Sequence, residues 1–199
     1  MPRTGTTAVQ TLLSKRYNIP NAAEPFAPGK YLFNSIDQVL DWTKQHRPCV
    51  IKVLSGQKYF EHIDQMLDQD SGAKLFLCER ENLTDTCISL NVVKLTGQFH
   101  FAIKPDLSHL GTVEIPMDHV HYWLSDIYRP YCNIIRTWQE QGRELVEICY
   151  EDLIKQNELE IEGSRVKISG FPFVNSEIDY VKLCSNYQQI QDLISTFRV

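Results

Sequence analysis

Residues 73–96 read AKLFLCERENLTDTCISLNVVKLT, and this stretch decides which fold the chain can adopt. Residues 73–79 are mostly apolar and predict a strand, while 82–96 predict a helix that ends at Gly97. A strand followed directly by a helix is the repeating unit of folds built on a parallel sheet.

The same order recurs on both sides of this stretch. Residues 49–54, CVIKVL, are a short and mostly apolar run that suits a buried strand, and 57–69 follow as an amphipathic helix. Residues 144–150, ELVEICY, predict one more strand, and 151–156 a short helix after it. The alternation predicts an α/β fold in which helices flank a mainly parallel sheet. The length of 199 residues suits a single domain over 1–199.

Further helices are predicted around these units. Ser35 has the residue type of an N-cap, and Pro130 is expected to kink or break the long helical stretch in which it lies. The three tryptophans, Trp42, Trp123 and Trp138, are expected to fill the core. The remaining predicted segments are a helix from near Thr6, an irregular loop at 18–29, helices at 35–46, 118–141 and 185–197 (the last capped by Ser185 or Asn186), and a hairpin at 162–170.

Charge and cysteine content narrow the class of protein. A nucleic-acid or membrane-surface binder needs a basic excess, so the net charge of -5 argues against both as partners. No run of about 18 apolar residues occurs, and no secretory leader is recognisable, which predicts a cytoplasmic protein if Met1 is the true start. The six cysteines are widely spaced and predict free thiols in a reducing compartment.

The first residues of the chain have the composition of an oxyanion cradle. Gly5 permits close approach of the backbone, the hydroxyls of Thr4, Thr6 and Thr7 add donors, and Arg3 adds a forked cation suited to phosphate or sulfate. A Walker A loop is disfavoured, and with it a nucleoside-triphosphate kinase, because Thr6 stands where that motif has Lys. An ordinary helix N-terminus capped by threonines is the alternative.

Four sequence segments resemble motifs of the sulfotransferases that use 3′-phosphoadenosine 5′-phosphosulfate (PAPS), and they occur in the same order along the chain. PRTGTT at 2–7 is similar to their 5′-phosphosulfate loop, and YEDL at 150–153 and NYQQI at 186–190 are similar to two later landmarks. Between them, a segment resembles the 3′-phosphate motif of bacterial carbohydrate sulfotransferases, including the trehalose-sulfating type. The residues that fit this motif are Arg80, Asn82, Leu83, Ser89, Thr96, Gly97, Phe99 and His100.

The resemblance implies a P-loop-like sulfotransferase fold, with PAPS as cosubstrate, no metal, and a carbohydrate or other small hydroxyl acceptor. Arg3 and residues 4–7 would hold the 5′-phosphosulfate, and Arg80 with Ser89 the 3′-phosphate. An Arg at a strand's end and a hydroxyl from the next helix can indeed grip one phosphate from two sides. The alternative is a buried Arg80 paired with one of the neighbouring carboxylates, Glu79, Glu81 or Asp85.

The base that deprotonates the acceptor has two candidates. Glu24, in the irregular loop, is similar in position to the carboxylate base of the bacterial carbohydrate enzymes, and a carboxylate in a partly dry cleft can serve in this way. Lys52 lies inside an apolar run, where a lysine should snorkel, pair or face a site. A solvated loop residue remains the alternative for Glu24.

The family places a strand before the phosphosulfate loop, whereas only Met1 and Pro2 precede Arg3 here. We therefore expect a fold that lacks the first strand, from a shortened reading frame or a degenerate relative. This leaves a second functional hypothesis open, namely a catalytically inactive relative that binds a nucleotide or a partner.

Overall fold

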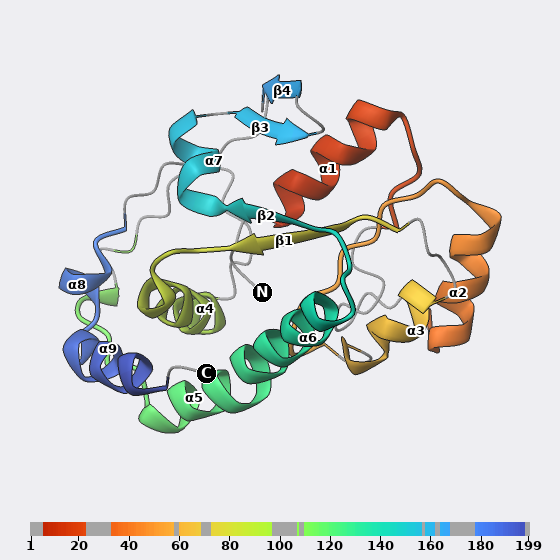
Figure 1. The fold of residues 1–199 in the computed structure, drawn as a ribbon. Helices are drawn as coiled ribbons and strands as arrows, with labels where there is room; N and C mark the ends of the chain where they lie inside the picture. Colours follow the sequence, from red (N-terminus) through yellow and green to blue (C-terminus); the bar gives the residue numbers. More distant parts are fainter. Residues whose placement is uncertain are drawn as a thin grey trace.

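A computed structural model describes residues 6–22, 33–57, 60–68, 73–96, 107, 110–156, 158–161, 164–167 and 178–197. Arg3, Thr4, Gly5 and Glu24 of the predicted site lie outside these residues, as do Gly97, Phe99 and His100 of the 3′-phosphate motif. The described elements form an α/β structure in which helices lie on both sides of a short parallel pair of strands (Figure 1).

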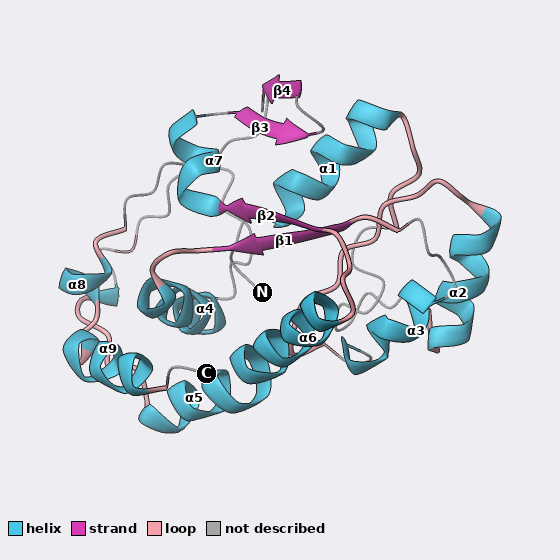
Figure 2. Ribbon diagram, in the orientation of Figure 1, coloured by secondary structure: helices cyan, strands magenta, loops and turns pink. Residues whose placement is uncertain are grey.

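The central pair is β1 (Leu75–Glu79) with β2 (Leu145–Cys149), and its register runs from Leu75 opposite Leu145 to Glu79 opposite Cys149. Both strands were predicted, and so was their parallel direction. A separate antiparallel hairpin, β3 (Glu158–Ile161) with β4 (Ser164–Lys167), lies beside α1 and α7 (Figure 2). A hairpin was predicted at 162–170; the observed one begins earlier, at Glu158, and residues 168–170 lie outside the described ranges.

The predicted strand at 49–54 is wrong. Val50 forms an isolated parallel bridge with Asn21, and residues 51–54 have no regular structure. The Val50 N–H donates to the carbonyl of Pro20 at 2.9 Å, and the Ala22 N–H donates to the Val50 carbonyl at 3.0 Å. Pro20 has no N–H to extend the ladder toward Pro48, and on the other side of the bridge the Leu54 N–H is bound by the Gln57 side chain at 3.0 Å.

Most predicted helices are confirmed, and the helix predicted at 57–69 is shorter than expected. Ser35 is the N-cap of its helix and accepts from the Gln38 N–H at 3.3 Å, while Asn186 occupies the N-cap position at the last helix. The helices are α1 (Thr6–Tyr17), α2 (Ile36–Gln45), the 3-10 turn η1 (Phe60–His62), α3 (Ile63–Asp68), α4 (Leu83–Thr96), α5 (Met117–Tyr122), the π-helical segment η3 (Trp123–Tyr128), α6 (Arg129–Glu140), α7 (Tyr150–Gln156), α8 (Tyr180–Leu183) and α9 (Tyr187–Thr196).

Pro130 widens the long helix rather than breaking it. The helix continues from α5 through the π-helical segment into α6, and Pro130 lies in the first turn of α6. The Arg129 N–H donates to the carbonyl of Leu124, five residues back. Because proline lacks an N–H and its ring crowds the carbonyl four residues earlier, a wider turn before it relieves the clash.

Two apolar clusters pack against opposite faces of the parallel pair. Leu77 of β1 belongs to the larger cluster, which includes side chains of α4, α6 and α9. Cys78, the next residue, belongs to the smaller cluster with side chains of α1 and α7, as strand alternation requires. Trp123 and Trp138 are buried as predicted, but Trp42 is only half-buried and stacks on His46 with ring centroids 4.5 Å apart.

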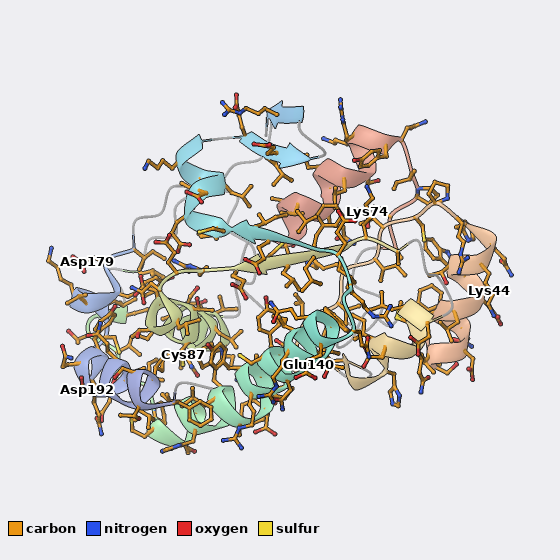
Figure 3. The ribbon with its side chains drawn as sticks, viewed as in Figure 1. Lys44, Lys74, Cys87, Glu140, Asp179 and Asp192 are labelled. Carbon is orange, nitrogen blue, oxygen red and sulfur yellow. The ribbon has the colours of Figure 1, made fainter. Side chains whose placement is uncertain are left out.

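All six cysteines are free thiols, as predicted. Cys87 is fully buried, and Figure 3 shows it on the side of α4 that faces α5 and α9. Within the part of the chain that the structure describes, no helix is long and apolar enough to cross a bilayer.

Candidate functional site

The first turn of α1 meets a buried lysine. Lys52 is 7% exposed, and its Nζ donates to Thr7 Oγ1 at 2.7 Å. The apolar face of α1, which includes Val9 and Leu12, packs on the smaller cluster and fixes the orientation of the helix. The contact joins two predicted site residues that are 45 positions apart in the chain, while Thr6 lies beside them as the first residue of α1.

The charge of Lys52 also reaches β1. Burial raises the pKa of the Cys78 thiol to about 11, and the positive charge of Lys52 acts in the opposite direction. Cys78 therefore remains a neutral thiol at neutral pH, and it is a packing residue of the smaller cluster. The Thr7–Lys52 pair thus borders the face of β1 that α1 covers.

Arg80 directly follows β1, and its guanidinium is held by α7. Arg80 Nε donates to Glu151 Oε1 at 3.3 Å, and the guanidinium carbon lies 4.8 Å from the centre of the Tyr150 ring. The same α7 contributes Leu153 to the smaller cluster, beside Val9 of α1. The two helices that contact Lys52 and Arg80, α1 and α7, therefore pack on the same cluster.

Glu151 joins the carboxyl ends of both strands of the pair. Its Oε2 accepts from the Glu81 N–H at 3.1 Å and from the Cys149 thiol at 3.3 Å. Burial favours the neutral carboxyl, but the hydrogen bonds of Glu81, Cys149 and its own N–H, together with the charge of Arg80, hold the pKa of Glu151 below its usual value. The carboxylate is therefore ionised at neutral pH.

Ser89 is buried within α4, at 2% exposure, in a helix that packs against the larger cluster. The side-chain hydrogen bond recorded for Arg80 goes to Glu151 of α7. Asn82 caps this helix by accepting from the Asp85 N–H at 3.0 Å. The structure thus gives the Asn of the 3′-phosphate motif a local folding role and pairs its Arg with Glu151.

A pocket of about 410 Å³ opens on the other face of β1. Glu79, Arg80, Tyr128 and Arg136 line it, together with Tyr131, whose hydroxyl donates to Glu79 Oε1 at 2.9 Å. No sequence motif predicts this pocket, because its two sides come from β1 and from the helix around Pro130. The charged Glu79 at the end of an apolar strand was the one local signal that could have pointed to it.

The sequence analysis also missed Tyr150 and Glu151 as functional candidates, although both lie in the YEDL landmark after a predicted strand. Side chains at the carboxyl ends of adjacent parallel strands meet at one edge of a sheet, and this rule could have found them. In the ranges that the structure describes, no group of three or more His, Cys, Asp or Glu side chains could hold a metal ion.

Comparison of the chain with protein-family models, with curated proteins and with solved structures finds no match. The functional assignment therefore depends on the residues themselves and on the arrangement described above.

Proposed function

We propose that this chain is a sulfotransferase that moves a sulfuryl group from PAPS to a hydroxyl of a carbohydrate or other small acceptor. The observation that carries the proposal is the contact between Lys52 and Thr7, because it sets a buried ammonium beside the first turn of α1. A buried cation next to unpaired helix N–H groups suits an anion. The ordered landmarks in the sequence support the same activity.

The cations of the described site fit a ligand with two anionic ends. Lys52 contacts the first turn of α1, and Arg80 follows β1 and pairs with Glu151 of α7. Both helices contribute side chains to the smaller cluster. In this proposal the cation near α1 serves the 5′-phosphosulfate, and Arg80 serves the 3′-phosphate. A nucleotide bisphosphate is the ligand class with this charge pattern.

Each residue has a proposed part in the transfer. Arg3 and residues 4–7 hold the phosphosulfate, and Lys52 supplies positive charge where the departing bisphosphate gathers negative charge. Glu24 is the proposed base that takes the proton of the acceptor hydroxyl as the sulfuryl group is transferred in line. PAPS is the proposed donor, and the family resemblance implies that no metal ion takes part.

One observation counts against Arg80 as a ready-made phosphate ligand and so favours the second candidate, a catalytically inactive relative that binds a nucleotide or a partner. The Arg80 guanidinium already has a carboxylate partner in Glu151, so its charge is partly neutralised before any ligand arrives. Under this alternative the chain binds the bisphosphate without transferring a sulfuryl group. Sulfuryl transfer from labelled PAPS to a panel of sugars distinguishes the two candidates, since only the first yields labelled product.

Binding of adenosine 3′,5′-bisphosphate, measured by calorimetry, tests both candidates against an unrelated function. Arg80→Ala should lower the affinity about 10- to 100-fold, because charge-assisted hydrogen bonds contribute roughly 1.5–3 kcal/mol. Arg143→Ala is the matched control, since Arg143 also pairs with a carboxylate, Asp68, at 2.6 Å, but lies before β2 rather than after β1. If the wild-type chain does not bind the bisphosphate, both proposals fail.

A further inference from the structure

The Glu151 carboxylate lies where an oxyanion ligand of Arg80 would bind. Arg80 Nε, the Glu81 N–H and the Cys149 thiol all donate to it, at 3.3, 3.1 and 3.3 Å. These three donors, called here the Arg80 site, come from the carboxyl ends of two different strands. A guanidinium with a backbone N–H is a donor set that binds phosphate and sulfate as readily as carboxylate.

Two features other than the carboxylate restrain the Arg80 guanidinium. The centre of the Tyr150 ring lies 4.8 Å from the guanidinium carbon, so the ring packs against the guanidinium through a cation–π contact. The Arg80 side chain is only 14% exposed, so neighbouring atoms restrict its rotation. Among the described residues, its hydrogen bond to Glu151 uses Nε, which leaves the two terminal nitrogens as donors for a larger anion.

The carboxylate can leave the site without movement of the backbone. Glu151 lies in the first turn of α7 and its side chain is 33% exposed, so rotation about its side-chain bonds takes the carboxylate into water. Leu153, two residues further on, is buried in the smaller cluster and anchors the helix. Replacement of the Glu151 carboxylate by another anion therefore requires only rotation of the Glu151 side chain.

We propose that Glu151 is a specificity-determining residue that occupies the Arg80 site until a dianionic phosphate monoester displaces it. The inference rests on the proposed function, in that it concerns the Arg80 end of the same nucleotide. Coulomb attraction to one guanidinium grows with ligand charge, so a phosphate dianion replaces the carboxylate more readily than a monoanion does. Glu151 thereby favours nucleotides that carry a phosphate monoester at the Arg80 end over nucleotides that lack it.

Calorimetry on the full chain tests the inference with two probes, inorganic phosphate and adenosine 3′,5′-bisphosphate. Glu151→Gln keeps the side chain's size but removes the competing charge, and it should bind both probes about tenfold more tightly than wild type. Glu147→Gln is the matched control, because it removes the same charge from an exposed position on β2. Addition of Arg80→Ala to Glu151→Gln should abolish the gain.

The outcomes separate the inference from the proposed function. If Glu151→Gln binds the bisphosphate no more tightly than wild type and Glu147→Gln, the inference is overturned and the proposed function stands. If Glu151→Gln binds inorganic phosphate through Arg80 but no variant binds the bisphosphate, the inference stands and the proposed function fails. Absence of binding for both probes in all variants overturns both.

A measurement on the wild-type chain covers the case in which Glu151→Gln does not fold. The backbone N–H of Glu81 donates to the carboxylate, so its nuclear magnetic resonance signal reports which anion it contacts. Titration with inorganic phosphate should shift this signal further than titration with acetate at equal ionic strength. Equal shifts for the two anions would overturn the inference.

Discussion

The contact between Thr7 and Lys52 offers a quantitative test of the site, because it joins a buried cation to one hydroxyl. Thr7→Val removes the hydroxyl and keeps the shape of the side chain, so the ammonium loses an acceptor at 2.7 Å while it remains 7% exposed. Charged hydrogen bonds contribute about 1.5–3 kcal/mol. For a chain of this size, that loss lowers the melting temperature by roughly 3–12 °C.

A double-mutant cycle isolates this contact from other effects of the substitution. In a Lys52→Met background the ammonium is absent, so Thr7→Val should change the free energy of unfolding by less than about 0.5 kcal/mol. Thr11→Val is the matched control, because the Thr11 hydroxyl bonds to a carbonyl of its own helix, at 2.9 Å. Free energies come from urea unfolding of each variant.

One result would refute the reasoning. If Thr7→Val costs the same free energy with Lys52 and with Met at that position, the contact contributes nothing to the site.

Three further predictions concern other parts of the chain. Gly56→Ala should destabilise the protein by about 1–3 kcal/mol more than Gly111→Ala, measured by urea unfolding. Both glycines have positive φ, 82° and 59°, but a Cβ at Gly56 would lie 2.9 Å from a side-chain atom of Ile127, whereas a Cβ at Gly111 would meet no atom within 4 Å. The difference in free energy of unfolding between wild type and Glu151→Gln should shrink as pH falls. A carboxyl whose folded-state pKa is lowered stabilises the fold above its unfolded pKa and loses that contribution as pH drops through the folded value. Equal differences at pH 7 and pH 3.5 would contradict this. Burial raises the pKa of Cys87 to about 12, so little of it is the reactive thiolate at pH 8. Iodoacetamide should therefore modify Cys87 roughly 100-fold more slowly than the half-buried thiols, measured by peptide mass spectrometry. Similar rates would show that the thiol is accessible.

The local elements could be predicted because their signals lie within a few residues of one another. Ser35 caps its helix through an N–H three positions away, and Val9 and Leu12 lie on one buried face of α1 because helical spacing puts them there. The strands β1 and β2 were likewise apolar runs that a neighbouring helix must cover. Each of these choices depends on short-range backbone geometry, which the sequence carries directly.

Partners distant in the chain could not be predicted in this way. Sequence analysis offered Glu79, Glu81 and Asp85 as carboxylates for Arg80, since all lie close to it along the chain. The carboxylate that pairs with it is Glu151, 71 positions away, because the parallel register brings the ends of β1 and β2 together. Local proximity gave the wrong partners, and only the pairing of the strands identifies the right one.

The segment 49–54 shows the same difference between local signals and distant contacts. The sequence by itself determined that it is apolar and that Lys52 within it needs a polar partner. Only the tertiary structure shows that it is not a strand: Val50 makes a single parallel bridge with Asn21, and the Leu54 N–H is bound by the Gln57 side chain. The tertiary structure also makes the Thr7 hydroxyl one partner of Lys52, because packing of α1 on the smaller cluster brings its first turn to the lysine.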